Sequence, residues 1–284
     1  MSEKKTGLIL EGGAMRGMFT CGVTDVFMEN GIKFDGAAGI SAGAVFGCNI
    51  KSGQNRRAIR YNMKYSKDSR YCSIWSLVTT GDMYGADFCY HKIPDELDVF
   101  DRETFKSDPM EFYVGATDVE TGRAVFHRCS DGMSRDIEWF RASASMPLAS
   151  QIVEVDGYKL LDGGIVCAVP YRFMQKRGYN RNVIILTQPK GFVKKKSALM
   201  PMMEMTMGKY PELVKAMRVR HEMYNKQMQE IAELEDNGTI VIRPPASLGI
   251  SRTESDPAEL RRVYLLGRKT GKKRLEEVRE YLEK

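Results

Sequence analysis

A serine lies between two glycines in the segment Gly39-Ile40-Ser41-Ala42-Gly43, and this spacing is typical of a nucleophile elbow. In an elbow the serine sits at the turn from a buried strand into a helix, where side chains two positions away would collide. Gly39 and Gly43 remove that collision. The amides that follow Ser41, starting with Ala42, open the predicted helix and would face a developing oxyanion. The segment predicts Ser41 as a nucleophile, although plain strand-to-helix turns share the pattern.

A second glycine-rich segment, Glu11-Gly12-Gly13-Ala14-Met15-Arg16-Gly17, follows the apolar run of residues 6–10. Loops at the carboxyl ends of neighbouring parallel strands open at the same edge of a sheet, so this loop is expected beside Ser41. We predict that the amides of Gly12 and Gly13 donate to the oxyanion and that Arg16 adds a positive charge. The loop lacks the G-x-G-x-x-G pattern of dinucleotide sites and the Lys-Ser/Thr of a P-loop.

A serine nucleophile needs a base, and this chain offers histidines or a carboxylate. The histidines are His91, His127 and His221. A triad of the α/β-hydrolase kind places its histidine after its acid, and only His221 follows Asp162, within a pattern of charged residues typical of an exposed helix. Asp162 ends a predicted strand before Gly163 and Gly164, so a tight turn can present its carboxylate to Ser41. These residues favour Asp162 as the base, and the histidine triad stays an alternative.

The ordered set of a Gly-Gly-x-x-Arg-Gly loop, G-I-S-A-G and D-G-G resembles the patatin-like phospholipases. The run from Arg141 to Pro147 is similar to the A-S-x-A-x-P segment that this family carries before its aspartate. The resemblance covers about residues 6–190. It implies a Ser-Asp dyad without a catalytic histidine, in which Ser41 is the nucleophile and Asp162 the base.

The same resemblance implies oxyanion donors in Gly12 and Gly13 with Arg16 beside them. Ala14 departs from the family pattern, because a third glycine is common at its position. Its amide remains an available donor, but the approach to it is tighter. No metal or organic cofactor is implied, and the six cysteines are scattered singly without a metal-binding spacing. The C-terminal part resembles that of a bacterial branch of patatin-like proteins, which implies a bacterial source.

The elements that must position these residues follow from apolar periodicity and breakers. Strands are predicted at 6–10, 32–40, 110–119, 123–127, 152–155, 158–161, 182–187 and 239–242, and helices at 18–28, 41–50, 54–68, 131–145, 170–177 and 210–236. Two consecutive strand-loop-helix units open this order, which indicates a parallel sheet. The predicted fold is therefore α/β, with three α/β/α layers around a mostly parallel central sheet. Residues 70–100 show no clear period.

Residues 1–190 are predicted to form the catalytic domain, and residues 191–284 a mainly helical extension packed on it. In that extension Lys190–Met207 is basic and rich in methionine, and two charged helices are expected after Pro257, split between Gly267 and Gly271. We expect the walls of a substrate pocket to come from residues 70–100 and from the methionine-rich segment.

The composition fits a soluble globular protein, with 43% hydrophobic and 28% charged residues in 284 positions. No signal sequence opens the chain and no apolar run has membrane-spanning length, so a cytoplasmic protein is predicted. A net charge of +6 biases the protein toward anionic surfaces. Transient contact with an anionic membrane stays open, whereas no nucleic-acid motif is present. The sequence carries no signal for an oligomeric state.

The function predicted from these residues is hydrolysis of a carboxylic ester of a lipid through an acyl-enzyme. The head group, the acyl-chain length and the positional preference are not encoded in any motif. One alternative is a non-catalytic lipid-binding or interaction module, in which Lys190–Met207 lies on a membrane. The other is an esterase with a Ser-His-Asp triad.

Overall fold

The first strand, β1 (Lys5–Leu10), is buried near the middle of an eight-stranded sheet in the computed structural model, which describes residues 4–283. Its side chains alternate between the two faces of the sheet, so Leu8 and Leu10 join one apolar core and Ile9 joins another. Cores on both faces require a helical layer on each side of the sheet.

The strand order is β5-β6-β3-β2-β1-β7-β8, and β4 pairs with β3 outside this path. The further strands are β2 (Gly36–Ile40), β3 (Glu111–Asp118), β4 (Arg123–Cys129), β5 (Val153–Val155), β6 (Tyr158–Asp162), β7 (Tyr179–Ile185) and β8 (Ile240–Ile242). The four central pairs, from β3 through β8, are parallel. Strands β4, β5 and β6 pair in the antiparallel sense. The prediction of a mostly parallel central sheet is confirmed.

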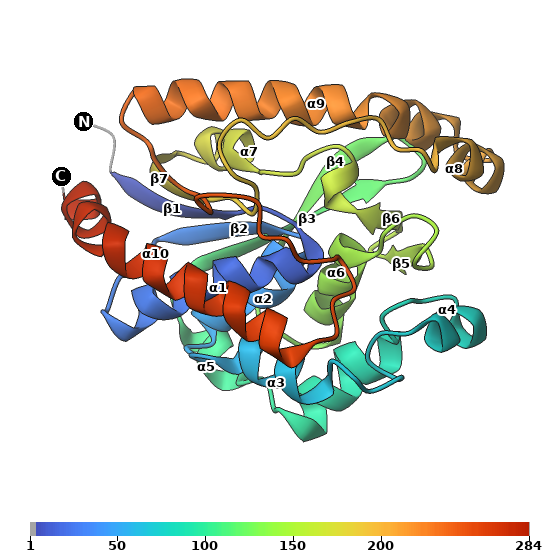
Figure 1. Ribbon diagram of the computed structural model, residues 1–284, viewed down its shortest axis with the longest axis horizontal. Coiled ribbons are helices and arrows are strands. Elements are labelled where there is room, and N and C mark those ends of the chain that lie inside the picture. The colour runs from blue at the N-terminus through green and yellow to red at the C-terminus, as the bar shows by residue number, and fades with distance from the viewer. Residues whose placement is uncertain (1–3, 284) are drawn as a thin grey trace.

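Helices cover both faces of the sheet (Figure 1). One layer contains α1 (Gly17–Glu29), α2 (Ala42–Lys51), α3 (Arg57–Tyr65), α5 (Arg102–Ser107), α6 (Ser134–Ala144) and α10 (Pro257–Glu283). The opposite layer contains α7 (Tyr171–Lys176) and α9 (Pro211–Asp236). None of the helices within residues 4–283 combines the length and the apolar character that crossing a membrane requires.

The remaining helical elements are η1 (Ala14–Arg16), α4 (Ile74–Thr80), the π-helix η2 (Phe88–Leu97), η3 (Gly163–Ile165) and α8 (Met200–Met207). Of these, α4 and α8 lie at one end of the molecule (Figure 1). Residues 70–100, which show no clear period in the sequence, therefore form short helices and loops, as expected.

Helix α10 corrects one prediction, because it runs without a break where two helices were expected. Gly267 and Gly271 face α1 instead of ending a helix. A Cβ atom built on Gly267 would lie 2.0 Å from the carbonyl oxygen of Phe19, and one on Gly22 would lie 2.1 Å from that of Tyr264. Small residues let the two backbones approach closely, so here glycine marks helix packing and not a helix end.

Polar contacts add to this packing of α10 on α1. The Tyr264 hydroxyl donates to Asp25 at 2.8 Å, and Arg268 forms an ion pair with Glu29 at 2.6 Å. The hydrogen bond from Arg268 is the main cause that lowers the pKa of Glu29 to about 2. The C-terminal segment is thus attached to the first helix of the chain by steric fit as well as by charge.

Gly267→Ala is expected to lower the free energy of unfolding by about 1–3 kcal/mol, because the added methyl group has no space against the Phe19 carbonyl. Helix propensity alone would favour alanine by about 1 kcal/mol, so a loss would report the clash. Urea unfolding followed by circular dichroism measures the change. Lys269→Ala, an exposed change in the same helix, should stay within about 0.5 kcal/mol of wild type. A stabilised Gly267→Ala protein would contradict the steric explanation.

Candidate active site

Ser41 stands at the turn between β2 and α2, with φ 54° and ψ −123°. A non-glycine residue in this region stores roughly 1–3 kcal/mol of backbone strain. Glycines surround it because the backbones touch: a Cβ on Gly39 would lie 2.3 Å from the Gly43 carbonyl oxygen, and one on Gly43 would lie 2.4 Å from that of Leu10. The predicted elbow geometry is therefore present, with the serine at its tip.

Ser143 of α6 holds the elbow from behind. The backbone N–H of Ser41 donates to the Ser143 hydroxyl oxygen at 2.8 Å, and that hydroxyl donates to the Gly115 carbonyl on β3 at 2.7 Å. Ser143 is fully buried, so no water competes for these bonds. It lies in the run from Arg141 to Pro147, and its contacts give that run a structural role in fixing the backbone of Ser41.

The glycine loop after β1 lies against the elbow. A Cβ on Gly12 would lie 3.0 Å from the Cβ of Ser41, so glycine is needed for this approach. The Gly12 amide is engaged, because it donates to the Ala168 carbonyl at 3.5 Å. Within residues 4–283 the amides of Gly13, Ala14 and Ala42 have no such acceptor. These three are the donors that the geometry leaves free for an oxyanion.

Ala14 adopts φ 48°, a left-handed conformation that favours glycine. This explains in physical terms why a glycine is suited to that position and why alanine there is strained. The strain leaves the amide in place, and Ala14 still lines the cavities on both sides of Ser41.

Asp162 ends β6 and is buried, with 5% of its surface exposed. Its N–H donates to the Ser145 carbonyl at 2.7 Å, and one carboxylate oxygen accepts the Gly164 amide at 2.7 Å. Burial raises the pKa of Asp162, while the charge of Arg220 and the hydrogen bond with Ser41 act in the opposite direction. The structure brings Ser41 and Asp162 together and gives the carboxylate a raised basicity.

The two glycines after Asp162 are also required by close contacts. A Cβ on Gly163 would lie 2.4 Å from the Gly115 carbonyl oxygen, and one on Gly164 would lie 2.9 Å from the Asp162 carboxylate. A side chain at Gly163 would collide with the backbone of β3, and one at Gly164 would crowd the Asp162 carboxylate.

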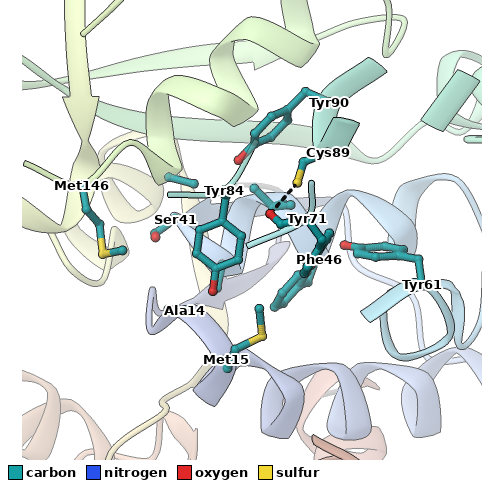
Figure 2. A pocket seen from close by; sticks show the side chains of 13 residues that line it. Ala14, Met15, Ser41, Phe46, Tyr61, Tyr71, Tyr84, Cys89, Tyr90 and Met146 are labelled. Carbon is teal, nitrogen blue, oxygen red and sulfur yellow. Dashed lines mark hydrogen bonds between the residues drawn. The ribbon is translucent and has the colours of Figure 1, made fainter. Parts of the chain in front are cut away.

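An apolar cavity of about 600 Å³ opens on one side of Ser41 (Figure 2). Aromatic, aliphatic and sulfur-containing side chains form its walls, with the Ser41 hydroxyl at one end. The lining residues are Ala14, Met15, Ser41, Ala42, Val45, Phe46, Tyr61, Tyr71, Tyr84, Cys89, Tyr90, Ala144 and Met146. Four of these come from residues 70–100, the segment that was expected to supply pocket walls. An acyl chain is the kind of group that such a cavity accepts.

A polar cavity of about 450 Å³ opens on the other side of Ser41 and contains Asp162. Its lining residues are Glu11, Gly12, Gly13, Ala14, Arg16, Ser41, Met146, Asp162, Gly164, Ala168, Lys194, Arg220, Tyr224 and Arg252. Within Lys190–Met207, Lys194 lines this cavity, whereas Leu199 and Met203 line a larger outer opening next to it. The predicted nucleophile, base and glycine loop therefore share one cavity with four basic side chains.

The histidines are placed elsewhere. His127 bonds to Asp136 at 2.7 Å, and His91 lies 3.8 Å from Glu138. His221 lines the outer opening and lies 3.7 Å from Glu222. In the described part of the chain no histidine hydrogen bonds with Ser41 or Asp162. The geometry gives a Ser-His-Asp triad no support.

One group of side chains, His127, Cys129 and Asp136, brings potential metal-ligating atoms within 4.8 Å of one another. The Asp136 carboxylate already accepts three backbone amides, from Ser130 to Gly132, in addition to His127. Burial raises the pKa of Cys129 well above its usual range, which keeps the thiol protonated. The His127 and Asp136 side chains are thus engaged in structural hydrogen bonds, and none of the three residues lines either cavity at Ser41.

Sequence reasoning missed Ser143 and the basic residues Lys194, Arg220 and Arg252. Arg220 lies in a long helix that reads as a charged surface helix, and Arg252 lies in a loop without a motif. Only the fold brings these distant positions to Ser41, so no local signal could have identified them. Lys194 was noticed as part of a basic run, but its position inside the cavity was not.

Two family models match the chain. The model described as "Patatin-like phospholipase" matches residues 8–174. The model described as "Domain of unknown function (DUF6363)" matches residues 210–283.

Relatives that match about two thirds of the chain are found in bacteria and eukaryotes. "Uncharacterized protein YjjU" of Escherichia coli is 27% identical over 65% of this chain and 52% of its own length. "Lysophospholipase NTE1" of Chaetomium globosum is 26% identical over 62% of this chain and 11% of its own length. The chain thus spans about half the length of the bacterial relative and about a tenth of the fungal one.

Among solved structures, VipD from Legionella pneumophila matches with a TM-score of 0.48 and 11% identity, over 97% of this chain and 67% of that one. The family model for patatin-like phospholipases covers more than half of the chain, and it contains the elbow, the glycine loop and the aspartate turn. The chain belongs to the patatin-like phospholipase family.

Proposed function

We propose that this protein is a serine acyl hydrolase that cleaves carboxylic esters of lipids through a dyad of Ser41 and Asp162. One observation carries the proposal: Ser41 stands where an apolar cavity meets a polar cavity that contains Asp162. Family membership and lysophospholipase relatives support a lipid ester as the substrate. The chain's two cavities suit the two parts of such an ester, an apolar acyl chain and a polar alcohol.

The proposed reaction has two steps, acylation of Ser41 and hydrolysis of the acyl-enzyme. Asp162 accepts the proton of Ser41 as its hydroxyl oxygen attacks the ester carbonyl, and the amides of Gly13, Ala14 and Ala42 donate to the oxyanion. The alcohol leaves with the proton from Asp162, which forms an acyl-enzyme on Ser41. Water then attacks the acyl group, gives its proton to Asp162, and releases the fatty acid as Ser41 regains its proton.

A non-catalytic lipid-binding module is the second candidate from the sequence. The strained backbone of Ser41, the free amides and the buried carboxylate favour the hydrolase, because a binding module needs none of them. The strained Ala14 in the donor loop is the feature that favours the module.

A fluorophosphonate probe should label the wild-type protein at Ser41. Ser41→Ala should abolish labelling and lower kcat/KM for a short-chain nitrophenyl ester by at least ~10³-fold, because the nucleophile is gone. Ser69→Ala, which removes an exposed hydroxyl, should leave both unchanged. Peptide mass spectrometry identifies the labelled residue. Labelling at another serine, or none in folded protein, would rule out this nucleophile.

Asp162→Asn should keep the fold and lower kcat by roughly 10²–10⁴-fold, because the amide accepts no proton. The wild-type enzyme should lose kcat/KM on acidification at a pH above 3.8, the usual pKa of an aspartate, because burial raises the pKa of Asp162 and only its ionised form is a base.

Measuring kcat/KM for an uncharged nitrophenyl ester as a function of pH gives this acidic limb, the fall in activity at low pH. His221→Ala should leave the limb in place. If the limb disappeared in His221→Ala, or if Asp162→Asn kept wild-type activity, the Ser-His-Asp triad would be the better hypothesis.

We further propose transient contact with a membrane through the end of the molecule that carries α4 and α8 (Figure 1). Ile74, Trp75 and Val78 of α4 are 73%, 60% and 79% exposed, and Met205 of α8 is 79% exposed. Exposed Lys195 and Lys196 lie just before α8. Apolar side chains beside lysines are suited to an anionic lipid surface.

Trp75→Glu combined with Met205→Glu should reduce co-sedimentation with phosphatidylglycerol vesicles at least about fivefold, because each change places a carboxylate against an anionic surface. The Ser41→Ala background prevents hydrolysis during the assay. Leu265→Glu, a matched change at an exposed residue of α10, should bind like its parent. Equal binding by the double variant, or no binding by its parent, would contradict this surface.

A further inference from the structure

We propose that the C-terminal part of the chain completes a phosphate-binding subsite beside Ser41, which selects esters whose alcohol part carries a phosphate monoester. The inference rests on the proposed function, since it names the substrate class of the same site. It assigns a role to residues in and around the region matched by the domain of unknown function.

Four basic side chains converge on the polar cavity from separate parts of the chain. Arg16 comes from the glycine loop and Lys194 from the loop after β7, whereas Arg220 lies on α9 and Arg252 follows β8. Within residues 4–283 none of the four forms an ion pair with a carboxylate. Such a cluster of unpaired cations in one cavity repels itself unless an anion occupies it.

The charge in the cavity can be counted. Two carboxylates, Glu11 and Asp162, line the same space as the four cations, which leaves an excess of two positive charges. Glu11 is committed to the wall, because it accepts bonds from the Thr187 amide at 2.5 Å and the Tyr224 hydroxyl at 2.7 Å. A phosphate monoester carries about −1.5 to −2 charges near neutral pH, which matches the excess.

Two of the cations, Arg220 and Lys194, are held by contacts with the cavity walls. Arg220 donates from Nε to the Gly164 carbonyl at 2.8 Å, so both terminal nitrogens of its guanidinium are left for a ligand. The Lys194 ammonium lies 4.1 Å from the centre of the Tyr224 ring. The Nε of Arg16 is buried without a partner. Forked guanidinium groups are suited to the oxygens of a phosphate.

The pKa values of these groups agree with an anion-binding role. Burial, and next the charge of Arg220, lower the pKa of Lys194 to about 8. Burial also lowers the pKa values of Arg16 and Arg220. A bound phosphate would offset the desolvation of all three.

The position of the subsite determines which part of the substrate it holds. The polar and apolar cavities share Ala14, Ser41 and Met146, so they meet at the nucleophile. With the acyl chain in the apolar cavity and the carbonyl at Ser41, the alcohol part extends toward Lys194 and Arg252. The phosphate therefore belongs to the leaving alcohol.

The test compares hydrolysis of 1-hexanoyl-glycerol 3-phosphate with that of 1-hexanoyl-glycerol, which share the acyl chain and dissolve without vesicles. Wild-type enzyme should prefer the phosphate ester in kcat/KM at least ~10-fold, since a hydrogen bond to a charged group is worth about one decade in binding or more. Lys194→Gln combined with Arg252→Gln should remove most of this preference. Arg261→Gln, which removes a charge at an exposed residue outside both cavities, should keep it.

Calorimetric titration of Ser41→Ala with glycerol 3-phosphate and with inorganic phosphate provides a second readout that needs no turnover. Glycerol 3-phosphate should bind, and the additional Lys194→Gln and Arg252→Gln changes should weaken it at least ~10-fold. Thermal denaturation of each variant shows that it is folded.

Equal rates for the two esters would overturn the head-group assignment, and binding of inorganic phosphate in that case would identify a site for a free anion. Absence of binding by either phosphate would overturn the subsite. If neither ester is hydrolysed and no probe labels Ser41, the proposed function fails, while the calorimetry still decides whether the anion subsite exists.

Discussion

Contact between backbones at the carboxyl edge of β1 and β2 is the constraint on which the rest of the site depends. Gly43 approaches the Leu10 carbonyl and Gly39 approaches Gly43, so the first strand, the elbow and the following helix leave no room for side chains. Ser41 can be held in a strained conformation because these contacts and the Ser143 hydrogen bond oppose its relaxation. The amides that face the site are a product of the same close packing.

Burial of charged groups is the second constraint on the site. Asp162 is buried at the edge of the sheet, and burial raises the pKa of its carboxyl group. The nearby charges and hydrogen bonds lower this pKa only in part, so the carboxylate remains a better base than one in water. The same edge also removes Arg16 and Arg220 from much of the solvent. Burying these charges costs free energy, and charged groups with shifted pKa values are common at functional sites.

The sequence predicted what local chemistry determines. Glycine spacing placed the elbow and the aspartate turn, and alternating apolar residues placed the strands, because those signals act between near neighbours. It failed where tertiary contacts decide. Gly267 and Gly271 were interpreted as a helix break but form a packing face. Arg220 belongs to a pattern typical of an exposed helix, and no motif marks Arg252, yet both line a cavity. Ser143 was contained in a noticed motif, yet its bonds to two other elements could not be inferred.

One hydrogen bond joins the walls of the apolar and the polar cavity. The Tyr84 hydroxyl donates to the backbone carbonyl of Arg252 at 2.9 Å. Tyr84 lines the apolar cavity, and Arg252 lines the polar one. Substitutions at these two positions are therefore expected to be epistatic, since a change at one shifts the support of the other. A lineage that replaced Tyr84 would change the support of the Arg252 backbone in the same step, so the walls of the two cavities are expected to evolve together.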